Sequence, residues 1–403
     1  MKKIVVIGAG QIGRETACQV AEMGYDVDII NRCTNESQAA SSADQAGARA
    51  IIDKNSLKVV ELLNARMTGK LTFKKYANEE ELGVLLCEAN FVAVCVGRTL
   101  NSMSNESKGI PHPLQGAVEN SNIYEAIGKA IAENAADDVR VLSTAIPVEV
   151  VANTLYSSIK KNWSKSIERK TEFHAGRICA GGTLLDTIRL KNVVLDYINA
   201  KEERATEIID VYALGSHGYG PYSDQYEIGL MASTHCGSIR FGGVRRLDGT
   251  WTDGDLIPFD QIINYAEKQT LMKAAFTQPV YIRDAAGERA LHKEAGRSNA
   301  VVIKAFLQPE LFQGMKLSLA VFSKDKQLFY GGVCTMTESG LFEEIPPSTY
   351  LSSQEQEVFN VRIRGIQKVN DAIKTTAPGT SLDTIVALGK QLDLQPQQLI
   401  GFI

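Results

Sequence analysis

A glycine-rich turn near the start of the chain, residues 8–13 (GAGQIG), constrains the fold more than any other feature of the sequence. It follows an apolar, β-branched run at 3–7 (KIVVI), which has the pattern of a strand buried on both faces. Apolar residues then recur at helical spacing from Ile12 to Met23, and residues 27–30 predict a second buried strand. The order strand, glycine turn, helix, strand predicts the first unit of a doubly wound, parallel α/β sheet.

The spacing GxGxxG in this setting predicts a Rossmann domain that binds a dinucleotide. The first glycine allows a tight turn, the second lets the backbone approach a pyrophosphate, and the third allows the helix to pack closely on the strand. The helix N-terminus adds amide donors and a partial positive charge. The alternative, a glycine turn without function, is disfavoured because the turn lies between a strand and a helix. The predicted cofactor-binding residues are Gly8, Gly10, Gln11, Ile12, Gly13, Asn31, Arg32, Val96 and Gly97.

The end of the second strand bears on the choice of cofactor. An acidic residue that accepts from the ribose 2′-hydroxyl of NAD is expected here, but the sequence has Asn31 followed by Arg32. A guanidinium at this place can pair with a 2′-phosphate, and no carboxylate would repel that phosphate. We therefore expect NADP rather than NAD, unless Arg32 is a solvated loop charge.

A third buried strand is predicted at 91–96, and a loop rich in Ser, Asn, Gly and Pro follows it from Arg98 to Pro113. Open α/β sheets place their ligands at such loops, at the carboxyl ends of the strands. A polar run at 160–170 predicts the crossover to a second domain. We expect a dinucleotide-binding domain at 1–163 and a catalytic domain at 164–403. Predicted elements of the second domain are a helix at 183–195, strands at 206–214, 300–307, 315–323 and 327–336, and a closing helix at 352–374.

Composition and charge exclude several classes of protein. Hydrophobic residues make up 44% and charged residues 22% of the 403, which is typical of a globular chain. A net charge of −4 gives no reason to expect nucleic acid or an acidic membrane as partner. No stretch approaches the ~20 apolar residues of a membrane span. The seven cysteines are scattered singly, without metal-ligand spacing, which predicts reduced thiols in the cytoplasm and no metal site.

Two short motifs in the second half carry the candidate chemistry. In residues 182–189 (GTLLDTIR), Asp186 and Arg189 are three apart and share one helix face. In residues 214–218 (LGSHG), His217 follows a strand and lies in a sterically open turn. An acid, a base and an anion anchor are the minimum set for oxidising a hydroxy acid. Taken singly, the alternatives are a core histidine and an ordinary ion pair within one helix.

In this order the two motifs resemble those of the lactate/malate dehydrogenase family, which has a G-T-x-L-D-x-x-R helix followed by a G-x-H-G turn. The resemblance extends over most of the chain, including 120–158 and 315–349, and is weaker at about 35–80 and 236–295. The second of these weaker stretches resembles an insertion. The resemblance implies an N-terminal Rossmann sheet, a C-terminal α+β domain, and a homodimer or homotetramer.

The resemblance also implies three catalytic roles. His217 would give or take the hydroxyl proton while a hydride passes to or from the nicotinamide. Asp186 would hold the imidazole in one tautomer and stabilise its charged form. Arg189 would bind the substrate carboxylate through two hydrogen bonds.

The sequence departs from the family at the substrate's carbonyl and far end. Asn105 stands where the family has a loop arginine that polarises the carbonyl, with Leu100 at a position that contacts the substrate's far end. Arg98 lies on the same loop and could replace that arginine, although it is out of register. Ile146 replaces the asparagine of a T-N-P motif. These changes favour a larger or less polar 2-oxo acid over lactate or malate.

The sequence therefore predicts an NAD(P)-dependent dehydrogenase acting on a small 2-hydroxy or 2-oxo acid. Two alternatives stay open. One is a dinucleotide-binding protein without catalysis, and the other is an opine-type dehydrogenase that condenses an amine with a keto acid. Amine-dependent oxidation of NADPH would distinguish the latter.

Overall fold

The structure is a computed structural model that describes residues 2–32, 68–97, 112–163, 171–201, 204–217, 229–243, 254–286 and 288–374, with the backbone alone at 112–116, 277–286 and 288–289. The first half contains β1 (Ile4–Ile7), α1 (Gln11–Glu22), β2 (Val27–Arg32), β3 (Leu71–Tyr76), α3 (Glu79–Leu86), β4 (Phe91–Val94), α4 (His112–Asn134), β5 (Arg140–Ser143) and α5 (Val148–Trp163). The second half contains β6 (Ile178–Ala180), α6 (Gly182–Asn199), β7 (Ala205–Ile209), β8 (Tyr212–Gly215), β9 (Leu230–Ser233), β10 (Ser238–Phe241), β11 (Asp255–Pro258), α7 (Phe259–Ile262), α8 (Tyr265–Ala286), α9 (Glu288–Leu307), β12 (Lys316–Ser323), β13 (Leu328–Met336), β14 (Phe342–Glu344) and α10 (Ser353–Lys374).

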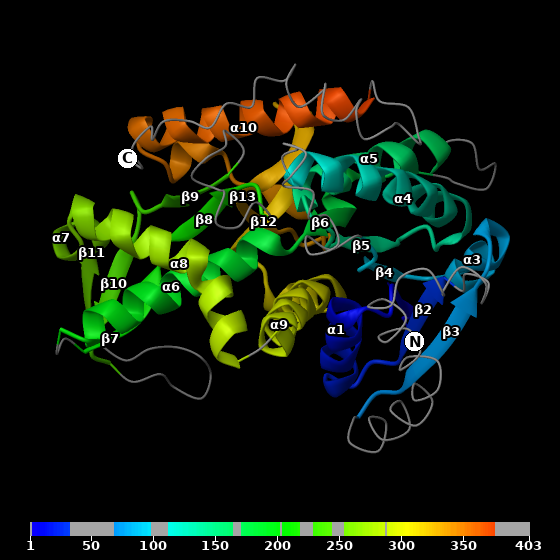
Figure 1. Cartoon of the computed structure of the whole chain (residues 1–403), viewed down its shortest axis with the longest axis horizontal. Helices are drawn as coiled ribbons and strands as arrows, with labels where there is room; N and C mark the ends of the chain where they lie inside the picture. The colour runs from blue at the N-terminus through cyan, green and yellow to red at the C-terminus, as the bar shows by residue number, and fades with distance from the viewer. Residues whose placement is uncertain are drawn as a thin grey trace.

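One large sheet runs through both halves of the molecule (Figure 1). Its first six strands, in the order β3-β2-β1-β4-β5-β6, are all parallel, and β12-β13-β8-β9 continue it antiparallel, with β14 paired to β13. A separate antiparallel sheet has the order β11-β10-β7. The predicted fold class, a doubly wound parallel sheet followed by an α+β part, is confirmed.

The predicted domain boundary at 163/164 stays a prediction. The sheet is continuous across it, because β6 pairs in parallel with β5 and in antiparallel with β12, through Ala180 and Ala320.

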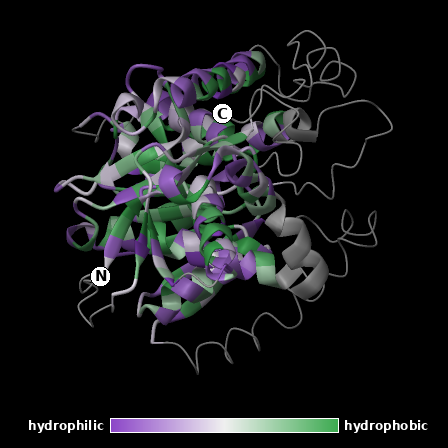
Figure 2. Cartoon of the chain, turned by 90° about the vertical axis from the view of Figure 1, so that its left-hand side faces the viewer, coloured by the Kyte–Doolittle hydropathy of each residue, from purple (hydrophilic) through white to green (hydrophobic). Residues whose placement is uncertain are grey.

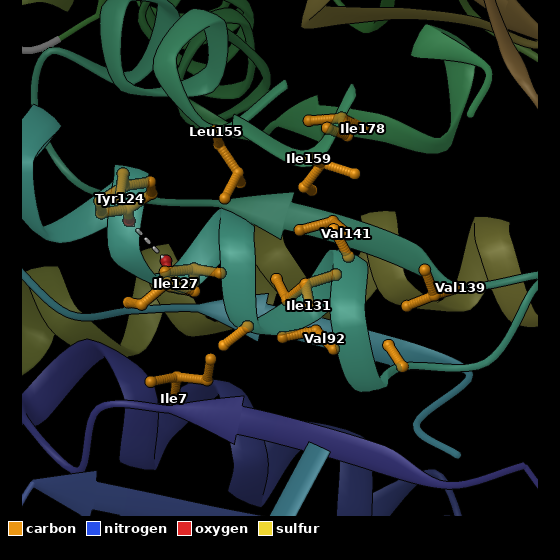
Figure 3. Close-up of a cluster of buried hydrophobic side chains, with 14 of the residues drawn as sticks. Ile7, Val92, Tyr124, Ile127, Ile131, Val139, Val141, Leu155, Ile159 and Ile178 are labelled. Atoms are coloured by element: carbon orange, nitrogen blue, oxygen red, sulfur yellow. Dashed lines mark hydrogen bonds between the residues drawn. The ribbon is translucent and has the colours of Figure 1, made fainter. Parts of the chain in front are cut away.

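The parallel sheet is buried on both faces because successive residues of its strands point to opposite sides. In β1, Ile4 and Val6 pack in a core with α1 and α9, and Val5 and Ile7 pack in a second core with α3, α4 and α5. Figure 3 shows part of the second core, where Ile127 and Ile131 of α4 lie between Ile7 and Leu155. In Figure 2 hydrophobic residues gather on the inner strands, and hydrophilic residues gather on the outer faces of helices. Helix α9, from the second half of the chain, thus completes the core of the first half (Figure 1).

Two predicted strands were wrong. Residues 300–307, predicted as a strand from their β-branched run, form the end of α9. Their buried members include Val302, Ile303 and Phe306, which lie at helical spacing and pack on the parallel sheet. Residues 206–214 form two strands in different sheets, β7 and β8, because Asp210 between them adopts a positive φ of 50°.

Among the described residues, no helix has the length and apolar character that a bilayer crossing requires. The six cysteines in the described part of the chain are all free thiols.

The fully buried Tyr124 of α4 ties the ends of two neighbouring strands together (Figure 3). Its hydroxyl donates to the carbonyl oxygen of Val94 at the end of β4 (2.8 Å). The same hydroxyl accepts from the backbone amide of Ala145, just after β5 (3.1 Å). The carboxyl ends of β4 and β5 are thereby held at a fixed spacing.

We predict that Tyr124→Phe lowers the free energy of unfolding by about 1–2 kcal/mol, because the amide of Ala145 loses its acceptor in a buried environment. The carbonyl of Val94 keeps a partner, since Thr144 also donates to it. Urea unfolding monitored by circular dichroism measures the effect. The control is Tyr265→Phe on α8, where the tyrosine is 58% exposed. Equal stability of both variants would contradict the prediction.

Candidate active site

The glycine turn lies between β1 and α1, where the strand order of the sheet reverses between β1 and β4. Gly8 has a φ of +104°, and a Cβ on it would lie 2.8 Å from the carbonyl oxygen of Cys95. A Cβ on Gly13 would lie 1.9 Å from the carbonyl oxygen of Gly8. A Cβ on Gly10, in contrast, has no atom within 4 Å. Gly8 and Gly13 are therefore required for packing, and Gly10 leaves open space beside the backbone.

This turn fits the pyrophosphate of a dinucleotide. Gly10 is the N-cap of α1 and offers no side chain to the first amides of the helix, at Gln11, Ile12 and Gly13. Such amides need acceptors, and an anion at a helix N-terminus supplies them. The site also lies at the topological switch point, where open α/β sheets bind their ligands.

The other predicted cofactor residues lie at the ends of β2 and β4. The side-chain oxygen of Asn31 lies 3.4 Å from the backbone amide of Ala9, so it braces the glycine turn. Arg32 follows at the exposed end of β2. After β4, Val96 is half-buried and Gly97 is exposed. Arg98 and Asn105, the predicted residues of the substrate loop, lie outside the described residues, as does Leu100.

We predict opposite outcomes for alanine at two glycines of the turn. Gly13→Ala should lower the free energy of unfolding by about 1–3 kcal/mol, because its methyl group collides with the backbone of Gly8. Gly10→Ala should leave stability unchanged, since Gly10 already has a negative φ of −63° and open space, but it should weaken binding of a nicotinamide dinucleotide. Thermal unfolding and fluorescence titration with NADH and NADPH measure the two effects. Equal losses of stability in both variants would refute this assignment.

The second candidate cluster joins the two catalytic motifs. The Nδ1 atom of His217 lies 2.6 Å from the Oδ2 atom of Asp186. The Oδ1 atom of Asp186 lies 3.6 Å from the Nη1 atom of Arg189, one helical turn along α6. The side chains of Asp186 and Arg189 are 5% and 7% exposed, and that of His217 is 20% exposed. The structure thus brings together the three residues predicted from sequence.

The imidazole lies directly against the first turn of α6. A Cβ on Gly182, the first residue of that helix, would lie 2.4 Å from the Cγ atom of His217. The glycine that opens the GTLLDTIR motif therefore makes room for the histidine ring.

A buried acid that the sequence interpretation missed contacts Ser216 and His217, the residues that form the histidine loop. Glu149, in the first turn of α5, is 0% exposed. Its Oε1 atom accepts from the backbone amide of His217 (3.0 Å), and its Oε2 atom accepts from the hydroxyl of Ser216. A signal was present, since Glu149 is a lone acid among apolar neighbours in a helix that follows Pro147.

Glu149 connects the loop of His217 to the first half of the chain. It lies close in sequence to Ala145, whose Cβ would be 2.8 Å from a Cβ on Gly97. Because Glu149 also accepts from the amide of His217, the loop that carries His217 lies against the helix that follows β5.

A second unpredicted acid contacts the arginine. The Oε2 atom of Glu294, on α9, lies 3.1 Å from Nη2 and 3.4 Å from Nε of Arg189. The side chain of Glu294 is 38% exposed. No sequence signal could have identified it, because Glu294 lies in a helix with other charged residues and outside both motifs.

The surroundings shift two pKa values. Burial raises the pKa of Glu149 to about 7, although the hydrogen bonds from Ser216 and His217 lower it. Burial lowers the pKa of His217, but the charge and hydrogen bond of Asp186 and the charge of Glu149 outweigh it and raise that pKa above the ordinary value of 6.5. His217 is therefore able to act as a proton donor near neutral pH.

We predict that Asp186→Asn lowers the pKa of His217, because the substitution removes the main charge and the hydrogen bond that favour the imidazolium. An NMR titration of the histidine ring signals measures the shift. His174 is an internal reference, since its pKa is lowered by its own burial and by neighbouring basic residues rather than by Asp186. An unchanged His217 titration would contradict the assigned pairing.

Among the described residues, no group of three or more His, Cys, Asp or Glu is arranged to hold a metal ion.

Comparisons with known proteins agree with this geometry at the level of the fold. Residues 1–126, less than a third of the chain, match the family model described as pyridine nucleotide-disulphide oxidoreductase. No curated protein sequence gives a significant match.

Solved structures match over nearly the whole chain. Malate dehydrogenase from Cryptosporidium parvum has 16% identity and a TM-score of 0.59, with 93% of this chain and 99% of that chain covered. The minor L-lactate dehydrogenase from Enterococcus mundtii has 17% identity, a TM-score of 0.61 and the same coverage. Trichomonas vaginalis lactate dehydrogenase, in complex with NADH and oxamate, has 12% identity and a TM-score of 0.64, with 93% and 98% covered. The chain therefore has the fold of the lactate and malate dehydrogenases over nearly its whole length.

Proposed function

We propose that this chain, which has the fold of lactate and malate dehydrogenases and a match to a pyridine nucleotide oxidoreductase model at its N-terminus, is an NAD(P)-dependent dehydrogenase. Its substrate would be a small 2-hydroxy or 2-oxo acid. The observation that carries the proposal is the contact of 2.6 Å between His217 and Asp186, with Arg189 beside it on α6. The singly scattered cysteines further support a cytoplasmic protein, and the polar run at 160–170 supports domains at 1–163 and 164–403. The resemblance to the family supports a homodimer or homotetramer.

His217 is the proposed proton donor and acceptor. Its Nδ1 atom is held by Asp186, which leaves Nε2 to exchange a proton with the substrate oxygen. When the substrate is reduced, Nε2 gives its proton to the carbonyl oxygen, and Asp186 stabilises the imidazolium beforehand. The nicotinamide, when bound, supplies or accepts the hydride. Glu149 fixes the backbone of His217 and so sets the position of the ring.

Arg189 is the proposed carboxylate anchor. Glu294 occupies the edge of the guanidinium formed by Nε and Nη2, so a substrate carboxylate would bind at Nη1 and Nη2. Beyond the carboxylate, the substrate would meet the half-buried, apolar Ile146 instead of the family's asparagine. This favours a larger or less polar 2-oxo acid over oxaloacetate.

The nicotinamide dinucleotide would rest on the glycine turn, with its pyrophosphate over Gly10. We propose NADP rather than NAD, because Arg32 ends β2 in an exposed position and Asn31 replaces the usual acid. Comparison of the affinities for NADPH and NADH in the wild type and in Arg32→Ala tests this choice.

We predict that His217→Gln lowers turnover by about 10²-fold or more, because the substrate oxygen loses its proton donor. The affinity for the dinucleotide should stay unchanged. The assay follows NADPH and NADH oxidation with a panel of 2-oxo acids, and His174→Gln is the matched control away from the site. A wild type that binds the cofactor but turns over no acid would favour the non-catalytic alternative. Oxidation that requires an added amine would favour the opine-type alternative.

The pH dependence should have a defined sign. Reduction of a 2-oxo acid needs the protonated imidazole, so kcat/KM should hold above pH 6.5 and fall as pH rises through the raised pKa of His217. Oxidation should show the opposite dependence. In Asp186→Asn the fall in the reduction rate should move to lower pH. Stopped or continuous assays from pH 5 to pH 10 measure both directions, and a profile with no such fall would oppose a His217 proton donor.

A further inference from the structure

Three carboxylates compete for one guanidinium at the proposed substrate anchor. Arg189 is 7% exposed and already contacts two acids, Glu294 through Nε and Nη2 and Asp186 through Nη1. A substrate carboxylate on the edge of Nη1 and Nη2 would be the third. Like charges held a few ångströms apart repel strongly in a partly desolvated site.

The cluster holds at least as many acids as basic groups before any substrate arrives. Arg189 carries one positive charge and His217 a second when it is protonated, whereas Asp186 and Glu294 are acids and the buried Glu149 is a third. A monocarboxylate would add one more negative charge to this site. A ligand that brings one negative and one positive group would add no net charge.

Glu294 is placed to receive that positive group. Its Oε2 atom is used by Arg189, and its side chain is 38% exposed, more than those of the other members of the cluster. The Oε2 atom of Glu294 lies 3.1 Å from Nη2 of Arg189, so this pair offers two opposite charges close together. This spacing matches an amino group one or two carbons from a carboxylate.

We propose that the substrate class of this site is a 2-hydroxy or 2-oxo acid that also carries a cationic amino group near its carboxylate, with Arg189 binding the carboxylate and Glu294 binding the amino group. The proposal rests on the proposed dehydrogenase function. In the oxidation direction, the C–H bond of the hydroxyl-bearing carbon breaks, and its electron pair leaves as hydride to oxidised NAD(P). The hydroxyl proton passes to His217 and the C=O bond forms. The amino group takes no part in the redox step.

The test compares two ligands that differ by one amino group, lactate and isoserine (3-amino-2-hydroxypropanoate). Calorimetry with the full chain and NADP, at a pH where isoserine is zwitterionic, should give at least about tenfold tighter binding of isoserine. In Glu294→Gln this preference should disappear, with weaker isoserine binding and tighter lactate binding. A merely structural role of Glu294 would weaken both ligands alike. Glu310→Gln, at an exposed position away from the cluster, is the matched control.

The ligand class and the dehydrogenase function are refuted by different results. If lactate binds as tightly as isoserine, if neither ligand binds, or if Glu294→Gln leaves their ratio unchanged, the inference is wrong. Turnover of simple 2-oxo acids that depends on His217 would keep the dehydrogenase function in that case. If isoserine binds with the predicted dependence on Glu294 and no acid is ever turned over, the ligand class stands and the dehydrogenase function falls.

Discussion

The site depends on the carboxyl group of Glu149, which is fully buried yet bonded to the loop of His217. A buried carboxyl group is costly unless donors satisfy it, and here the amide of His217 and the hydroxyl of Ser216 do so. Because Glu149 lies in the first turn of the helix after β5, it joins the loop of His217, in the second half of the chain, to the first half. Glu149 holds the backbone of His217 and Asp186 holds its ring, so the imidazole has one defined position.

Much of the first half was predictable because a parallel sheet buried on both faces has a simple sequence pattern. Runs of β-branched residues gave β1, β2 and β4 to within two residues, and the glycines at 8–13 gave the turn. Each of those glycines has a physical cause in the structure, either a clash or an open space. The long antiparallel pair β12 and β13 also agreed with its prediction.

The failures have physical causes as well. Val302 and Ile303 have high strand propensity, and only the neighbouring sheet and α1 decide that they lie in a helix. Asp210 divides one predicted strand in two because it adopts a positive φ, which the sequence did not predict. In the site, the resemblance of the GTLLDTIR and LGSHG motifs to the lactate/malate dehydrogenase family predicted Asp186, Arg189 and His217. Glu294 could not be predicted, because its contact with Arg189 spans 105 residues and depends on how α9 crosses α6.

Helix α9 links the two proposed binding sites. Gly296 lies against the backbone of Glu15 and Thr16 on α1, and Glu294, on the same helix, contacts Arg189. Asn299 adds a hydrogen bond to Thr16 (3.0 Å). In the proposed enzyme, a dinucleotide that stabilises α1 would also stabilise Glu294 through α9. Thermodynamic reciprocity would then require the acid substrate to raise the affinity for the dinucleotide by the same factor.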